Sequence, residues 1–105
     1  TPEAVDAAVK LSLSRLGVAR LPLLQFHSWD FLDGPGRWLS QLRLLAAHEG
    51  VAHLGLTNVD TEHLRCALSD GAPIVTNQIC FSLLDRRASE GSMCALCNER
   101  GVKIL

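Results

Sequence analysis

The sequence predicts an α/β fold built on a parallel sheet, and two features of the chain support this prediction. Helix-like stretches end on glycines, and a short apolar run follows each within a few residues; these glycines are Gly17, Gly50, Gly71 and Gly101. A glycine after a helix adopts the left-handed cap conformation without steric cost. The apolar runs alternate little with polar residues, which is typical of strands buried on both faces.

Four helices are predicted from caps and from apolar spacing. Thr1 can cap the first helix, and Pro2 suits its first position. Asp60 or Thr61 can cap the third helix. Within each segment apolar residues recur three or four positions apart, as they do on one face of a helix. The four helices are expected over residues 2–16, 37–49, 61–70 and about 93–100.

Four apolar runs between these helices are the predicted strands. They are expected over residues 21–26, 53–56, 73–75 and 102–105. Their starts lie roughly 20 to 30 residues apart, with no long polar linker between the units. This repeat fits part of a barrel, and it fits an open doubly wound sheet equally well. However, no G-x-G-x-x-G follows any strand, so the usual dinucleotide-binding fingerprint is missing.

Composition restricts the class of protein. The 105 residues suffice for one domain, and 48% of them are hydrophobic, more than a disordered chain carries. Ten basic and eleven acidic side chains give a net charge of -1, so we expect neither nucleic acid nor an acidic membrane as a partner. No apolar stretch approaches the roughly 20 residues of a membrane span, and the N-terminus lacks a signal-peptide pattern. We expect a soluble, non-secreted protein, cytoplasmic or located in a plastid.

Polar residues follow three of the predicted strands, at the edge where ligands collect in parallel sheets. The first strand leads into His27, the second into Thr57 and Asn58, and the third into Gln78. Taken singly, a histidine that ends a strand is more often structural than catalytic. Asn58 or Gln78 alone would more often cap a loop.

Four cysteines raise the alternative of thiol or metal chemistry. Their positions within predicted helices and a strand favour reduced thiols over disulfides. Cys94 and Cys97 form a C-x-x-C, but Cys66 and Cys80 do not provide a second pair at a matching spacing. We therefore expect no metal site and interpret Cys94 and Cys97 as small apolar groups on the inner face of a helix.

Three segments resemble successive strands of the aldo-keto reductase family. They are LLQFHSWDF (residues 23–31), HLGLTNVDTEHL (residues 53–64) and PIVTNQICFSLLDRR (residues 73–87). The resemblance extends over nearly the whole chain, in order and at matching spacing. It implies a partial (β/α)8 TIM barrel, about strands four to seven with their helices, so that residues 1–105 are a fragment of one barrel domain. It also implies an NADPH-dependent enzyme, with NADH as the other option, that reduces an aldehyde or ketone to an alcohol.

The resemblance assigns roles to the polar strand ends. His27 matches the family's catalytic histidine, which hydrogen-bonds the substrate carbonyl and orients it. Thr57 and Asn58 match a Ser-Asn pair, and Gln78 matches a glutamine; these residues hold the nicotinamide carboxamide in the family. The match is chemically reasonable because amides and a hydroxyl offer both donors and acceptors to a planar carboxamide.

The resemblance also indicates a substrate region and two departures. Trp29 and Phe31, in the loop after the first strand, are the visible candidates for lining the pocket of a small carbonyl substrate. Phe81 stands where many relatives carry a tyrosine, and the chain contains no tyrosine at all. The family's proton donor is a tyrosine assisted by a lysine and an aspartate, and the resemblance places all three upstream of Thr1. We therefore expect the 105 residues alone to be inactive.

Two further functions and one physical expectation remain. A non-catalytic relative would use the barrel as a cofactor-sensing or partner-binding module. A thiol or metal protein would use Cys94 and Cys97, and stoichiometric zinc would support it. Four strands of an eight-stranded barrel leave two unpaired edges and an uncovered interior face, so the isolated chain is expected to be oligomeric or poorly folded.

Overall fold

A computed structural model of the chain describes residues 1–28 and 35–105. Its sheet contains four parallel strands in the order β1-β2-β3-β4, so each strand lies next to its neighbour in sequence. The predicted α/β fold with a parallel sheet is therefore confirmed. The strands are β1 (Leu24–Phe26), β2 (Leu54–Thr57), β3 (Ile74–Gln78) and β4 (Lys103–Ile104).

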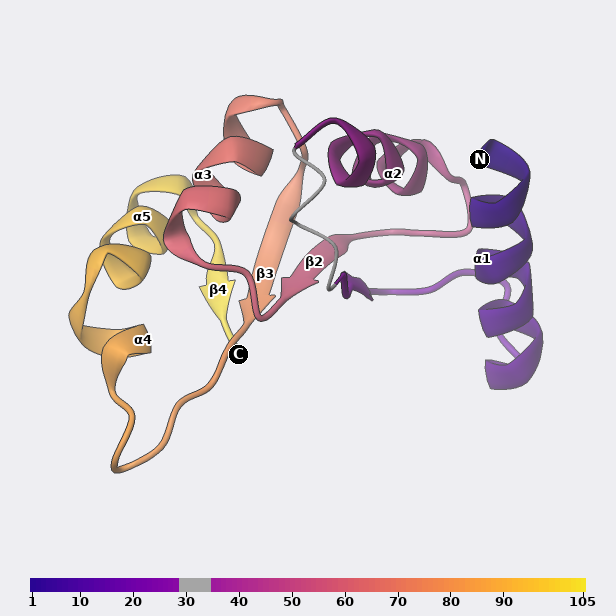
Figure 1. Cartoon of the computed structure of the whole chain (residues 1–105). Helices are drawn as coiled ribbons and strands as arrows, with labels where there is room; N and C mark the ends of the chain where they lie inside the picture. The colour runs from indigo at the N-terminus through magenta and orange to yellow at the C-terminus, as the bar shows by residue number, and fades with distance from the viewer. Residues whose placement is uncertain (29–34) are drawn as a thin grey trace.

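The described part of the chain has five helices. They are α1 (Pro2–Leu16), α2 (Pro35–Ala47), α3 (Thr61–Ser69), α4 (Arg87–Glu90) and α5 (Ser92–Arg100). Figure 1 shows α2, α3 and α5 arranged along one side of the sheet, with α1 beside α2. Within the residues described, no helix combines the length and apolar character that a membrane crossing requires.

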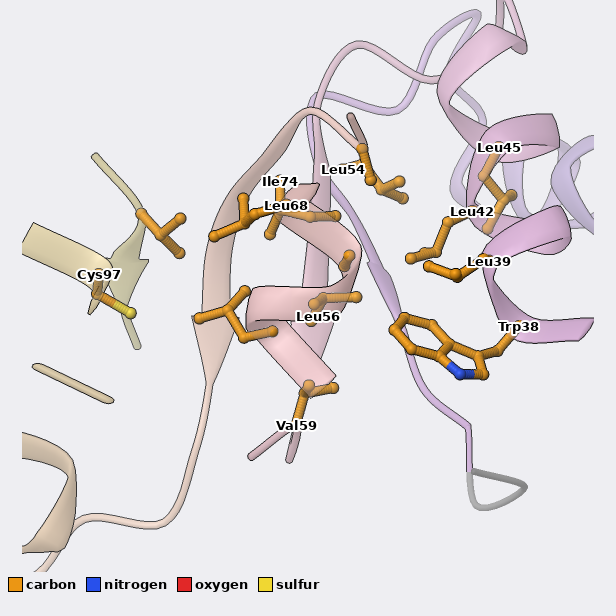
Figure 2. Close-up of a cluster of buried hydrophobic side chains, with 14 of the residues drawn as sticks. Trp38, Leu39, Leu42, Leu45, Leu54, Leu56, Val59, Leu68, Ile74 and Cys97 are labelled. Atoms are coloured by element: carbon orange, nitrogen blue, oxygen red, sulfur yellow. The ribbon is translucent and has the colours of Figure 1, made fainter. Parts of the chain in front are cut away.

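The hydrophobic core lies between the sheet and these helices. Leu54 and Leu56 of β2 are 1% and 0% exposed, and they face the apolar side of α2 (Figure 2). Apolar residues of α3 and α5 continue the same core around β3. The helix residues in this core include Trp38, Leu39, Leu42, Leu45, Leu64, Ala67, Leu68, Met93, Leu96 and Cys97.

The opposite face of the sheet carries small or polar residues. Gln25 is the register partner of Gly55, Gly55 that of Thr76, and Thr76 that of Lys103. Because side chains alternate between the two faces of a strand, this row points away from the core face that holds Leu54 and Leu56. The polar side chains at the strand ends therefore lie on this second face and on the loops that follow the strands.

Three of the four glycines predicted to end helices are in the left-handed region, and one is not. Gly71, with φ of 86°, follows the α3 cap residue Asp70. Gly17 and Gly101 end α1 and α5 with φ of 65° and 68°, in the left-handed region. Gly50 is not in that region, because α2 already ends at Ala47. There the side chain of His48 closes the turn, its Nδ1 accepting from the backbone N–H of Gly50 at 2.9 Å.

The first strand is shorter than predicted, and one helix was not expected. Residues 21–26 contribute a three-residue strand, Leu24–Phe26, and a separate bridge between Leu21 and Val51. Pro22 has no backbone N–H and cannot take part in a continuous ladder as a donor. The short α4 precedes α5, where the sequence indicated only one helix.

Candidate functional site

The carboxyl ends of β2 and β3 bring three of the predicted site residues together. Thr57 and Gln78 are register partners on the two strands. The backbone N–H of Asn58 donates to the backbone carbonyl of Gln78 at 2.7 Å. Asn58 and Gln78 are exposed, and Thr57 is half-buried. Asn58 has a φ of 54°, in the left-handed region that asparagine adopts more readily than most residues. The three side chains thus start from one short stretch of the sheet edge.

A fourth residue of this cluster, Gln25 on β1, was not among the predicted site residues. Its Nε2 donates to Oε1 of Gln78 at 2.8 Å, although β2 separates the two strands. The β2 residue in register with Gln25 is Gly55. A Cβ on Gly55 would lie 2.1 Å from Oγ1 of Thr76 and 3.4 Å from Cγ of Gln25. The glycine therefore leaves the space that the two neighbouring side chains use.

Two polar atoms of this face lack partners within the described residues. Oε1 of Gln25 and Oγ1 of Thr76 are buried, and neither has a hydrogen-bond partner there. Buried polar atoms are nearly always hydrogen-bonded in proteins, so each such exception needs an explanation. The described residues therefore leave two buried oxygen atoms beside Gln78 without hydrogen bonds.

His27 lies at the level of Thr57 and lines a cavity that Thr57 does not line. It directly follows β1, whose last residue Phe26 is in register with Leu56, the residue before Thr57. His27 is exposed and lines a cavity of about 460 Å³ between α1, α2 and β1. Gln25 lines the same cavity, whereas Thr57 and Gln78 do not. The candidates for the substrate pocket, Trp29 and Phe31, lie outside the described residues.

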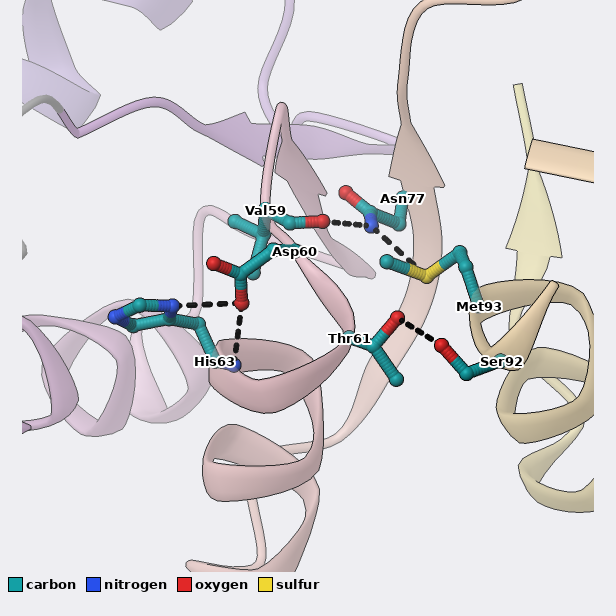
Figure 3. A network of polar contacts seen from close by, with 7 residues as sticks. All are labelled: Val59, Asp60, Thr61, His63, Asn77, Ser92 and Met93. Atoms are coloured by element: carbon teal, nitrogen blue, oxygen red, sulfur yellow. Dashed lines mark hydrogen bonds and ion pairs between the residues drawn. The ribbon is translucent and has the colours of Figure 1, made fainter. Parts of the chain in front are cut away.

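Asn77, next to Gln78, points the other way and is part of the core. Its side chain is 0% exposed. Its Nδ2 donates to the backbone carbonyl of Val59 at 2.9 Å and lies 3.6 Å from Sδ of Met93 (Figure 3). Asn77 therefore ties β3 to the segment between β2 and α3 and to α5. This contact anchors the loop that carries Asn58.

The starts of α3 and α5 are joined beneath that loop. Asp60 caps α3, its carboxylate accepting from the backbone N–H of His63 at 2.8 Å and contacting Nδ1 of the same residue at 2.7 Å. Burial alone would raise the pKa of Asp60, but the hydrogen bonds from His63 outweigh it and lower the pKa. Thr61 and Ser92 are linked through their hydroxyls at 3.1 Å (Figure 3). The segment from Asn58 to Thr61 is therefore held from both sides.

A cavity lies beside this segment and takes in Asn58. Its volume is about 890 Å³, and its walls come from the start of α3 and from residues 79–93. Its charges are largely compensated: hydrogen bonds from Arg87 lower the pKa of Asp85 to about 2, and Arg86 pairs with Glu90 at 3.0 Å. Thr57 and Gln78 are not among its lining residues.

The cysteines do not form a metal centre in the described part of the chain. No group of three or more His, Cys, Asp or Glu side chains suited to a metal ion occurs among the residues described. Cys97 is 1% exposed and contacts Sδ of Met93 at 3.7 Å, and burial raises the pKa of its thiol. Cys94 is half-buried and accepts from Nδ2 of Asn98 at 3.5 Å.

Comparison with known proteins gives a consistent family assignment. The profile of the aldo/keto reductase family matches residues 1–105. A glycerol dehydrogenase from Gluconobacter oxydans matches 99% of this chain with a TM-score of 0.83 and 23% identity. An aldo-keto reductase from Bacillus halodurans, in its holo form, matches 99% with a TM-score of 0.78 and 26% identity. The curated proteins gave no match.

A thermostable aldo-keto reductase in complex with the inhibitor epalrestat shows the same likeness. It matches 97% of this chain with a TM-score of 0.80 and 23% identity. The chain spans only 31%, 35% and 38% of the three solved chains, in the order Gluconobacter, Bacillus and thermostable enzyme. The likeness therefore concerns the fold of about a third of each of these proteins.

Proposed function

Because the chain belongs to the aldo/keto reductase family, we propose that it supplies about strands four to seven of a (β/α)8 barrel in a longer reductase. The four parallel strands in sequential order, with helices along one side, support this placement. The share of the solved structures that the chain spans, about a third, supports it as well. Gln25, Gly55, Thr76 and Lys103 would then face the interior of the barrel.

The proposed activity is the reduction of an aldehyde or ketone to an alcohol with NADPH, or with NADH. The observation that carries it is the cluster of Thr57, Asn58 and Gln78 at the ends of two adjacent strands. These residues fit a nicotinamide carboxamide. Oε1 of Gln78 accepts from Gln25, which leaves its Nε2 to donate to the carboxamide oxygen. The hydroxyl of Thr57 can accept from the carboxamide nitrogen.

The residues of this chain would bind and orient rather than transfer the proton. A bound nicotinamide would supply the hydride. Thr57, Asn58 and Gln78 would hold its carboxamide and so select the ring face presented to the substrate. His27 donates a hydrogen bond to the substrate carbonyl and orients it. The proton donor of the family is a tyrosine, and the 105 residues include none, so the proposal assigns the proton for the product alcohol to a tyrosine outside them.

The second candidate is a non-catalytic module that binds the cofactor without reducing a substrate. The 105 residues contain no tyrosine, and a full-length chain that also lacks the family's donor tyrosine would favour this candidate. This module would bind the cofactor through the same three residues. It differs from the reductase only in having no turnover.

The test uses the full-length protein that carries this chain. Cofactor binding is followed by fluorescence titration, and carbonyl reduction by the loss of absorbance of the reduced nicotinamide. Gln78→Ala should weaken binding by about 3- to 10-fold, the equivalent of one hydrogen bond. His27→Ala should leave binding unchanged and slow reduction by about a hundredfold or more. Asn98→Ala, on the exposed surface of α5, is the matched control.

Each result decides one part of the proposal. Unchanged binding in Gln78→Ala would refute the carboxamide site. Equal turnover in His27→Ala and the wild type would refute the catalytic role of the histidine. Tight binding without any reduction of a panel of aldehydes and ketones would select the non-catalytic module.

A further inference from the structure

We propose that Gln25 is a positioning residue for the cofactor site, holding the amide of Gln78 in one orientation. The proposal rests on the proposed function, in which Gln78 binds the carboxamide. Its starting point is the hydrogen bond from Nε2 of Gln25 to Oε1 of Gln78, at 2.8 Å. A contact of this kind between β1 and β3 is unusual, because β2 lies between them.

Gly55 makes the contact possible. Adjacent strands are about 4.8 Å apart, so β1 and β3 are separated by twice that distance, and a side chain on β2 would normally fill the gap. At the position in register with Gln25, β2 has a glycine. The Cγ of Gln25 lies 3.4 Å from the place of the missing Cβ. The glutamine therefore crosses β2 above Gly55 and meets Gln78, which lies two residues beyond Thr76 along β3.

The contact determines which atoms Gln78 offers to a ligand. An amide side chain has one oxygen that accepts and one nitrogen that donates, and a half-turn of its end group exchanges them. While Gln25 donates to Oε1, the Nε2 of Gln78 is the atom left for the cofactor. The site is thereby set to recognise a carbonyl oxygen. Without Gln25 the amide could turn, and the recognition would be lost.

The burial of Gln25 indicates that this residue serves more than packing. Its Oε1 is buried and has no partner within the described residues. An unpaired buried oxygen is unfavourable for folding, and an apolar side chain of similar size would avoid it. The contribution of a glutamine at this position is therefore the one hydrogen bond that its Nε2 donates to Gln78. Replacing it should cost cofactor recognition and not stability.

The experiment compares Gln25→Leu and Gln25→Glu with the wild type in the full-length protein. The probes are NADP and its thionicotinamide analogue, in which sulfur, a weak acceptor, replaces the carbonyl oxygen. The wild type should bind NADP about 3- to 10-fold more tightly than the analogue. Both variants should bind the two probes about equally, since neither side chain can donate to Oε1 of Gln78. Glutamate has the size of glutamine, so its result excludes a packing effect.

Two controls complete the design. Gln41→Leu makes the same exchange at a half-buried glutamine of α2 and should keep the preference for NADP. The melting temperature of Gln25→Leu should equal or exceed that of the wild type. Gln78→Ala tests the proposed function separately, because unchanged NADP binding there would refute the carboxamide site itself.

The inference is overturned if Gln78→Ala weakens binding while Gln25→Leu and Gln25→Glu both retain the preference for NADP. It is also overturned if Gln25→Leu lowers the melting temperature and retains the preference, because Gln25 would then be a structural residue. Loss of the preference in both variants, with stability kept, supports it.

Discussion

Asn77 and Gln78 are neighbours in β3, yet only one of them is available to a ligand. Alternation along the strand turns Gln78 to the open face and Asn77 into the core, where its Nδ2 donates to the carbonyl of Val59. Asn77→Leu leaves that carbonyl without its partner. In the full-length protein we expect the free energy of unfolding, measured with urea, to fall by about 1–3 kcal/mol.

The control for Asn77→Leu is Asn98→Leu, because Asn98 lies on α5 with its side chain exposed. Its bond to a thiol is weak, so its effect should stay within about 0.5 kcal/mol. Equal effects of the two changes would mean that the bond to Val59 contributes nothing. Because Asn77 faces away from the ligand side, its loss should affect the proposed cofactor site only through stability.

The cysteines are predicted to differ in their reactivity. Cys80 is exposed, whereas Cys97 is buried and burial raises the pKa of its thiol. Since the thiolate is the form that reacts, iodoacetamide at pH 8 should modify Cys80 first and Cys97 last. Peptide mapping by mass spectrometry measures the order. Equal rates in the folded protein, matching those in urea, would contradict the buried position of Cys97.

The raised pKa of Cys97 also has a consequence for stability. The folded state holds the proton more tightly than the unfolded state, so the full contribution of this thiol is present below its ordinary pKa. The contribution is lost as pH rises from that value through the raised pKa. Cys97→Ala should therefore flatten the alkaline part of the stability profile, measured by urea unfolding at increasing pH.

The polar residues at the strand ends could be predicted from the sequence, but the contact between Gln25 and Gln78 could not. Thr57, Asn58 and Gln78 end apolar runs, and the structure brings them together. Gln25 lies within such a run and offered no signal of its own. Its contact with Gln78 depends on the absence of a side chain at Gly55, a coincidence of register that no local pattern encodes.

At the scale of elements, α3 depends on its N-terminal cap. The carboxylate of Asp60 accepts from the backbone N–H of His63, and its pKa is lowered. Asp60→Ala removes the cap and should cost about 1 kcal/mol of unfolding free energy. Asp60→Asn keeps an acceptor and should cost less. Circular dichroism during urea unfolding measures both.

The pH dependence of the cap follows from the sign of its shift. A carboxyl group with a lowered folded-state pKa contributes its stability above its ordinary pKa, and this is lost as pH falls through the lowered value. The wild type should therefore lose this contribution to its stability as the pH falls below about 4. Asp60→Asn should lose less over the same range. If the unfolding free energies of the two proteins fall in parallel as the pH is lowered, the carboxylate of Asp60 does not contribute to the acid dependence.

The link between α1 and α2 passes through His48. Its Nδ1 accepts from the backbone N–H of Gly50, so Nε2 carries the hydrogen and donates to Asp6 at 3.3 Å. His48→Ala removes both bonds and should increase amide hydrogen exchange in α1 several-fold while β3 stays protected. His48→Asn, compared with His48→Ala, should restore the hydrogen bond to the N–H of Gly50 but not the contact with Asp6 in α1. Unchanged exchange in α1 would show that apolar packing alone holds it.

The elements were predicted more accurately than their ends. Thr1 and Gly17 frame α1 as expected, because caps are local in sequence. The end of α2 was misplaced because a histidine side chain, and not the glycine that follows, completes its last turn. The short strand Leu24–Phe26 reflects pairing with β2, which depends on residues some thirty positions away and on Pro22.

At the scale of the whole molecule, the described strands leave two open edges. β1 and β4 each have one neighbour in the described sheet, and their outer edges present unpaired N–H and C=O groups. Two leucines in the loop after β3, Leu83 and Leu84, are 96% and 99% exposed. Open edges and exposed apolar side chains both favour association.

The isolated 105-residue polypeptide should therefore associate or unfold. A variant can show whether the strand edges or the exposed leucines cause the association. Sedimentation velocity should show species larger than a monomer, growing with concentration. Leu83→Ser combined with Leu84→Ser removes the apolar contribution and leaves the edges intact. If association persists in this variant, the strand edges drive it, as expected for part of a barrel wall. If it disappears, the loop is responsible. A monomer with a sharp calorimetric transition would contradict the prediction, because a sheet with two open edges would then be stable alone.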